Sequence, residues 1–257
     1  MSPPSEPSSL DAMTSKPVYL ASDVHFGSVP AERERAFLAW LEQTATVASQ
    51  VVLNGDLFDF WFEYRTGVPR GHDRVLDTLR AVVAAGVPVT LMGGNHDWWG
   101  GRYLREEVGV DFLQHPVVRS YAGWRTFLAH GDGLGEGDLG YRALRLLLRG
   151  RVTRLAFALL PPELGDRIAG RVSRTGDRWG EPTADDKARA AALEVWAVAK
   201  LEAEPDLDLV VLGHTHVPLL RQVGPRRWYL NAGDWVYHGS YAVLEEGHPP
   251  RLLIWGV

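Results

Sequence analysis

The chain has 257 residues, of which 46% are hydrophobic and 23% charged, a length that predicts one domain with a large core and room for one insertion. It contains no cysteine, which excludes disulfides, iron–sulfur clusters, thiolate metal sites and a cysteine nucleophile, so any metal must be held by nitrogen and oxygen ligands. The formal net charge of -5 at pH 7 argues against a nucleic-acid-binding protein.

The first segment, residues 1–16, is rich in Ser and Pro and contains no apolar run, so we expect a disordered leader. It lacks the continuous apolar stretch of a secretion signal, and Met13 is an alternative start. No later stretch is apolar for long enough to span a bilayer. We therefore expect a cytoplasmic protein that is either free or peripheral on the inner face of the cell membrane.

Short apolar runs and helical patterns then predict the fold. Strands are expected at 18–21, 51–53, 87–92, 126–129, 209–212, 228–230, 241–244 and 252–255, and helices at about 31–48, 74–85 and 184–204. Because strand patterns crowd together without helices after residue 226, a four-layer α/β/β/α sandwich fits better than one open parallel sheet. Residues 17–257 are thus expected to form one α/β domain with a helical lid inserted at about 134–183.

Metal-ligand residue types follow five of the predicted strands. The clusters are Asp23-Val24-His25, Gly55 to Asp59, Gly94 to Asp97, His130-Gly131-Asp132 and Gly213 to His216. Sites in α/β folds gather at the carboxyl ends of strands. One such cluster is usually a turn, but turn chemistry does not require His before Gly-Asp or His-x-His after a strand. Together the five clusters predict a joint metal site.

These clusters, in this order, resemble the signature of the calcineurin-like metallophosphoesterase superfamily. The resemblance implies two metal ions, the first held by Asp23, His25, Asp56 and His216, and the second by Asp56, Asn95, His130 and His214. A carboxylate is the natural bridge because its two oxygens reach both ions. Mixed imidazole, carboxylate and amide ligation suits Mn²⁺, Fe or Zn²⁺, and the resemblance favours Mn²⁺. Two such ions can clamp a phosphoryl group and share a water of lowered pKa.

His96 lies between a proposed ligand, Asn95, and a further acid, Asp97. By the resemblance, Asn95 and His96 face the substrate phosphate, His96 stabilises charge or protonates the leaving oxygen, and Asp97 orients its ring. The alternative is that His96 only forms hydrogen bonds within its loop. For Asp59, Asp132 and Asp234, contact with a ligating histidine and an ordinary turn role both remain open.

The predicted insertion is strongly basic. Residues 141–178 contain nine Arg against three acidic residues, and leucines are threaded among the arginines on helical patterns broken at Gly150 and Pro161-Pro162. Two interpretations stay open. The segment is either a helical hairpin with a solvated basic face or an amphipathic lid that meets lipid or an anionic substrate.

The order of these parts also resembles the UDP-2,3-diacylglucosamine diphosphatases, peripheral membrane enzymes of lipid A synthesis. The matching segments are GDLFDFWFEY, GNHDWW, HGDGL with GDLGYRALR, the Arg-rich insertion, GHTHVP and NAGDWV. The resemblance implies hydrolysis of the pyrophosphate of UDP-2,3-diacylglucosamine to UMP and 2,3-diacylglucosamine 1-phosphate, with Asp138 contacting the substrate. The alternatives are a phosphoesterase for a soluble nucleotide or other phosphodiester, and a non-catalytic relative. The sequence leaves the oligomeric state open.

Overall fold

The computed structural model describes residues 16–135, 146–161, 164–165 and 180–256, and its largest element is a six-stranded sheet. The strands of this sheet, in spatial order, are β11 (Arg251–Ile254), β10 (Ser240–Leu244), β1 (Val18–Ala21), β2 (Gln50–Asn54), β3 (Val89–Met92) and β4 (Asp111–Leu113). Strands β1 to β4 are parallel, β10 pairs antiparallel with β1, and β11 pairs antiparallel with β10.

A second, five-stranded sheet packs against the first. Its strands, in spatial order, are β5 (Val117–Tyr121), β6 (Trp124–Leu128), β7 (Leu209–Leu212), β9 (Arg227–Asn231) and β8 (Leu219–Gly224). The three central strands, β6, β7 and β9, are parallel, while β5 and β8 pair antiparallel at the two edges. Strands β4, β5 and β8 are absent from the sequence prediction.

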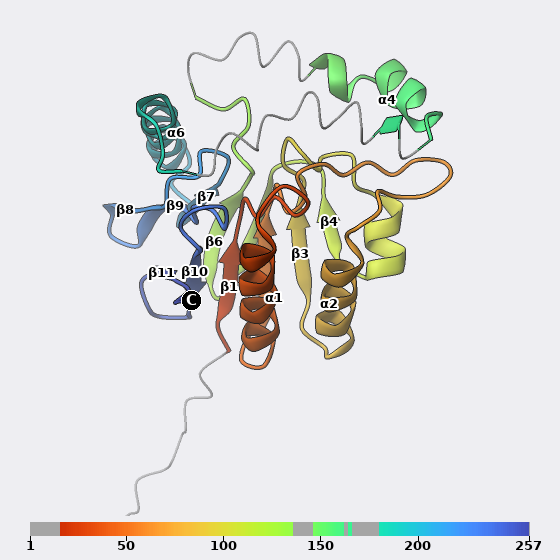
Figure 1. Ribbon diagram of the computed structural model, residues 1–257. Helices are drawn as coiled ribbons and strands as arrows, with labels where there is room; N and C mark the ends of the chain where they lie inside the picture. Colours follow the sequence, from red (N-terminus) through yellow and green to blue (C-terminus); the bar gives the residue numbers. More distant parts are fainter. Residues whose placement is uncertain (1–15, 136–145, 162–163, 166–179, 257) are drawn as a thin grey trace, which may run out of the picture.

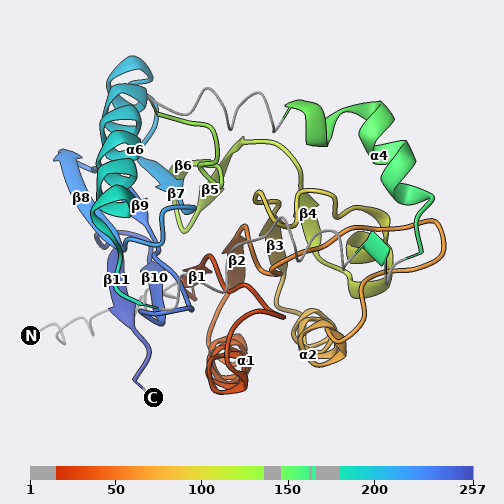
Figure 2. The ribbon, with the colours of Figure 1, turned by 45° about the horizontal axis from the view of Figure 1, so that its top comes forward.

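Helices cover the outer face of each sheet (Figures 1 and 2). Helices α1 (Ala31–Ala45) and α2 (Asp73–Ala84), with the π-helical turn η1 (Leu104–Val108), pack on the six-stranded sheet. Helix α6 (Ala184–Ala203) packs on the five-stranded sheet. Thr183 and Asp186 cap the start of α6 reciprocally through side chain and backbone. This arrangement confirms the predicted α/β/β/α sandwich.

The burial of alternate residues explains why the chain forms these layers. In β2, Val52 belongs to the core between the sheets, whereas its neighbours Val51 and Leu53 face the layer of α1 and α2. In β7, Val211 likewise lies between the sheets and Val210 lies against α6. Successive side chains of a strand point to opposite faces of its sheet. Because neighbouring residues are buried in different layers, both faces of the central strands are covered.

Within the predicted insertion, helix α4 (Arg151–Ala158) lies between the two predicted breaks at Gly150 and Pro161, and residues 146–149 before it are also helical. Figure 1 shows α4 apart from both sheets, and its residues contact the loops that follow β2 and β3. Residues 136–145, 162–163 and 166–179 of the insertion and nearly all of the expected leader lie outside the described residues. None of the described helices combines the length and apolar composition that crossing a bilayer requires.

Candidate metal centre

The five predicted clusters meet at one edge of the sandwich. They follow β1, β2, β3, β6 and β7, whose parallel directions within each sheet bring the carboxyl ends together. Five of their residues have positive φ without being glycine: Asp23 (54°), His25 (55°), Asp56 (51°), His214 (69°) and His216 (59°). Such backbone is strained by about 1–3 kcal/mol per residue and is usually retained where it positions functional groups.

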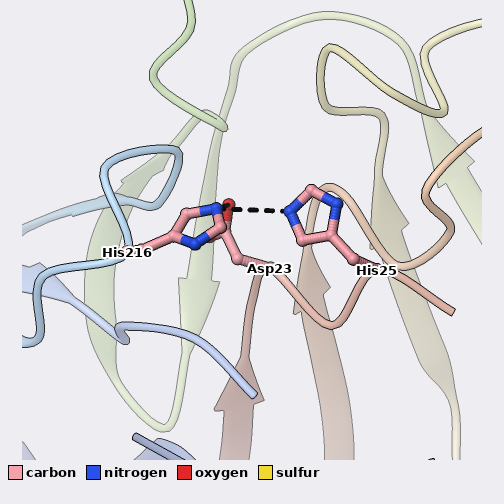
Figure 3. Close-up of side chains that lie close together, drawn as sticks. All are labelled: Asp23, His25 and His216. Atoms are coloured by element: carbon pink, nitrogen blue, oxygen red, sulfur yellow. Dashed lines mark hydrogen bonds and ion pairs between the residues drawn. The ribbon is translucent and has the colours of Figure 1, made fainter. Parts of the chain in front are cut away.

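Asp23, His25 and His216 form the first group of potential ligands (Figure 3). The imidazole Nε2 atoms of the two histidines lie 3.2 Å apart, and His216 Nε2 lies 3.4 Å from Asp23 Oδ1. Asp23 and His25 are buried, and His216 is largely so. Three ligand atoms therefore converge on one point although His216 is 191 residues from His25.

Asp56, His130 and His214 form the second group. Asp56 Oδ2 lies 3.1 Å from His130 Nε2 and 3.9 Å from His25 Nε2, so this carboxylate stands between the two groups. Asn95 follows β3, and its Oδ1 is buried without a hydrogen-bond partner in the described part of the chain. An unpartnered buried oxygen of this kind suits a cation, as does the surrounding set of carboxylates and imidazoles.

The electrostatics of the cluster also suit cations. Burial alone would raise the pKa of Asp56, but the imidazoles of His130, His96 and His25 hold it well below its ordinary value. Burial alone would lower the pKa of His130, yet Asp56 and Asp23 hold it well above the ordinary value. The buried carboxylates therefore favour a positive charge at the position between them. Divalent ions bound there would replace protons, since imidazole ligands must be neutral.

In two of the proposed ligating imidazoles, Nδ1, the ring nitrogen other than the ligand atom Nε2, faces an oxygen atom. His130 Nδ1 lies 2.8 Å from the main-chain oxygen of Asn54, and His25 Nδ1 lies 3.5 Å from Asp59 Oδ1. A proton on Nδ1 of His130 leaves Nε2 as the ligand atom, so the Asn54 oxygen fixes the tautomer that metal binding needs. Asp59 therefore contacts a proposed ligand, one of the two roles left open for it.

The structure corrects the role expected of Asp97. We expected Asp97 to orient His96, but the ring of His96 is contacted by Asp59, whose main-chain oxygen lies 2.6 Å from His96 Nδ1. The carboxylate of Asp97 instead accepts hydrogen bonds from four backbone amides, those of Asp56, Leu57, Phe58 and Gly94. These hydrogen bonds join the loops that follow β2 and β3.

The carboxyl group of Asp97 is buried, and opposing influences act on its pKa. Burial and the nearby charge of Asp56 raise the pKa of Asp97 to about 6, against the lowering effect of the amide donors. His96 completes the connection between the two loops, because its backbone N–H donates to Asp56 Oδ1 over 2.8 Å. The geometry also places an imidazole nitrogen of His96 within 4.8 Å of ligand atoms on His25 and Asp56.

Two glycines of the motifs allow this close packing. A Cβ on Gly94 would overlap the carboxylate of Asp56, and a Cβ on Gly55 would overlap the ring of His130. Gly55 also has φ of 89°, a conformation that side chains disfavour. Glycine is therefore required here because the ligands of one loop pack directly on the backbone of the next.

Asp132 makes a contact that sequence reasoning missed. Its Oδ2 accepts a hydrogen bond from Arg149 Nη2 over 2.9 Å, and the Arg149 guanidinium lies 4.7 Å from the ring centroid of Trp98. The predicted insertion is thereby tied to the loop that carries His130. The Arg-rich composition was the sequence signal, but it does not distinguish Arg149 from its neighbours. Asp138, the expected substrate contact, lies outside the described residues.

Comparisons with known proteins agree with this arrangement. The sequence profile of the calcineurin-like phosphoesterase family matches residues 16–218. A UDP-2,3-diacylglucosamine hydrolase of Porphyromonas gingivalis is 32% identical over 245 residues, which cover 89% of this chain and 94% of that protein. Proteins of the same name from Bordetella pertussis (32% identity, 79% and 78% coverage) and Ralstonia nicotianae (30% identity, 91% of each chain) are also similar. The matched segment contains all seven proposed ligands.

Proposed function

The chain belongs to the calcineurin-like phosphoesterase family, and on that premise we propose that it hydrolyses the pyrophosphate bond of UDP-2,3-diacylglucosamine to UMP and 2,3-diacylglucosamine 1-phosphate. The observation that carries the proposal is the convergence of two ligand groups around Asp56. The relatives named UDP-2,3-diacylglucosamine hydrolase, similar over most of the chain, support the choice of substrate. The protein is accordingly a metal-dependent hydrolase.

We propose that each ligand group holds one divalent ion, with Mn²⁺ as the native metal. Asp23, His25 and His216 would hold the first ion and Asn95, His130 and His214 the second, with Asp56 shared by both. Such ions, when bound, neutralise phosphate charge and lower the pKa of water.

Residues of the chain orient the reacting groups around this centre. The carboxylates fix the spacing of the two ligand groups. The His96 ring, held through Nδ1 by the Asp59 carbonyl, directs its remaining nitrogen to the substrate phosphate and the leaving oxygen. Its side chain is 15% exposed, like that of His216 (13%) and unlike that of His25 (2%), so His96 and His216 lie on the accessible side of the centre.

The proposed activity is tested by following UMP release from UDP-2,3-diacylglucosamine. Chelation with EDTA is expected to remove the activity, and added Mn²⁺ should restore it. Bis(p-nitrophenyl) phosphate serves as the soluble comparison substrate. Activity that persists after complete metal removal would overturn the metal mechanism, whereas a preference for soluble phosphodiesters would move the function to the alternative substrate class.

We further propose that α4 contacts lipid, which would make the enzyme peripheral on the inner face of the cell membrane. The helix is anchored by Phe157, whose ring lies 5.0 Å from that of Phe62 and 5.9 Å from that of Tyr64. Its outward side carries apolar residues at Val152 (81% exposed), Leu155 (69%) and Leu159 (69%). The exposed Arg151 lies beside them, a combination suited to anionic lipid surfaces, while the Arg154 guanidinium lies 5.5 Å from the ring centroid of Trp98.

Replacing Val152, Leu155 and Leu159 together with Ser is expected to weaken binding to anionic phospholipid vesicles by roughly tenfold or more, because the apolar area inserted into lipid is lost. Vesicle co-sedimentation measures this. Turnover of bis(p-nitrophenyl) phosphate should be unchanged, since the metal ligands lie elsewhere. The matched control is Val195→Ser, which changes an equally exposed valine (70%) on α6. Unchanged vesicle binding by the triple variant would contradict the proposed lipid contact.

A further inference from the structure

Asp234 lies beside the first ligand group but beyond the segment that the family profile matches. It belongs to the loop between β9 and β10, whereas the matched segment ends at residue 218. Its side chain is 2% exposed. A buried carboxylate needs compensating donors or charges. The arrangement of its partners therefore indicates why an acid is placed there.

Each oxygen of Asp234 has a distinct set of neighbours. Oδ1 accepts hydrogen bonds from the backbone N–H groups of Tyr237 (2.6 Å) and His238 (3.0 Å). Oδ2 faces two imidazoles, lying 3.7 Å from His216 Nδ1 and 3.1 Å from His238 Nδ1. The amides thus fix the carboxylate so that its second oxygen points at the back of the ligating ring of His216.

The loop is held firmly enough to aim this carboxylate. The N–H of the next residue, Trp235, donates to the main-chain oxygen of Asp23 over 3.1 Å, and the N–H of Ser240 donates to the main-chain oxygen of Asp234 over 3.1 Å. The Trp235 ring is buried against Phe37 and Trp40. Asp234 is consequently fixed relative to the same strand end that supplies Asp23 and His25.

We propose that Asp234 is a positioning residue for the first metal ion: it accepts the Nδ1 proton of His216 and so presents Nε2 of that ring to the ion. This inference rests on the metal centre of the proposed function. It agrees with the orientation of the ring, whose Nε2 faces Asp23 and His25. Oxygens that accept from the far nitrogen of a ligating histidine fix its tautomer and raise its basicity. His238 supplies a further donor to Asp234 that helps to stabilise the buried charge.

The substitution Asp234→Asn separates this role from simple packing. The amide oxygen of Asn can still accept from Tyr237 and His238, but its NH₂ group would then face His216 Nδ1 as a donor. A donor at this place favours the tautomer with the proton on Nε2, the nitrogen that must bind the metal. We expect one of two Mn²⁺ ions to bind about 10–100-fold more weakly, while the other keeps its affinity within a few-fold.

The measurement is a Mn²⁺ titration of metal-free protein, with thermal unfolding as a check on folding. Asp77→Asn, which removes one exposed carboxylate on α2, is the matched control and should bind both ions as the wild type does. Equal affinity of Asp234→Asn and wild type for both ions would overturn the inference. A wild type that binds no Mn²⁺ would instead overturn the proposed metal centre, so the two failures are distinguishable.

A second measurement on the wild type decides the matter if Asp234→Asn does not fold. In protein loaded with Zn²⁺, which is diamagnetic, the ¹⁵N resonances of the His216 ring report which nitrogen binds the ion. The expected result is coordination through Nε2 with a proton on Nδ1. Coordination through Nδ1, or the absence of a proton there, would overturn the role assigned to Asp234.

Discussion

Asp56→Asn is expected to lower phosphoesterase turnover by about 10³-fold or more, because interactions worth several kcal/mol depend on this one carboxylate. Asp56 Oδ2 lies between His130 Nε2, at 3.1 Å, and His25 Nε2, at 3.9 Å. Asparagine has the same size, but it removes the negative charge and turns an NH₂ group toward one of the two ligand groups. A neutral amide cannot offset the repulsion of two divalent ions held close together.

The comparison requires turnover and metal content of the same preparations. Bound metal should fall below two ions per chain in Asp56→Asn, and added Mn²⁺ should not restore the rate. Asp111→Asn is the matched control, since it removes an exposed carboxylate that pairs with Arg119 far from the ligand groups. Near-wild-type turnover in Asp56→Asn would show that this carboxylate does not join two ions.

Place in the sheets accounts for most of the difference between the strands predicted from sequence and those missed; the exception is β11, an edge strand that its apolar run predicted. The central strands carry continuous apolar runs, such as the wholly buried β3 and β7, because layers cover both of their faces. The missed strands β4, β5 and β8 all lie at sheet edges. In β5 exposed residues alternate with less exposed ones, and β8 has two exposed residues in the middle. An edge strand is defined mainly by its neighbour's hydrogen bonds, which its own composition does not record.

The metal ligands could be predicted because the strands that precede them could be recognised in the sequence. Each follows a recognisable strand, so the sequence prediction placed them at one edge of the sandwich, and the structure brings Asp23, His25, Asp56, His130, His214 and His216 into ligand groups there. The contacts around the ligands depend instead on loop geometry. Nothing local in the sequence indicates that Asp97 would accept hydrogen bonds from backbone amides of the loop after β2, or that Asp234 would face His216. Only the three-dimensional arrangement distinguishes these acids from ordinary turn residues.

His96→Ala is expected to lower kcat by about 10²–10⁴-fold, the usual contribution of one acid or electrostatic group, while bound metal stays at the wild-type level. The Nδ1 of His96 is engaged by the Asp59 carbonyl at 2.6 Å, which leaves one ring nitrogen for the reaction. The backbone N–H of residue 96, which donates to Asp56 Oδ1, survives the substitution. The link between the two loops is therefore retained when the ring is removed.

Metal content decides between the two roles that the geometry offers His96. Its ring lies within ligand range of His25 and Asp56, so a ligand would be lost if His96 binds an ion. Exposure does not separate the two roles, because the side chain of His96 is 15% exposed and that of the proposed ligand His216 is 13% exposed. His115→Ala, which removes an exposed imidazole near Trp98, is the control and should leave kcat unchanged. Loss of one ion per chain in His96→Ala, with a rate that excess Mn²⁺ restores, would make His96 a ligand and refute its assignment to the leaving group.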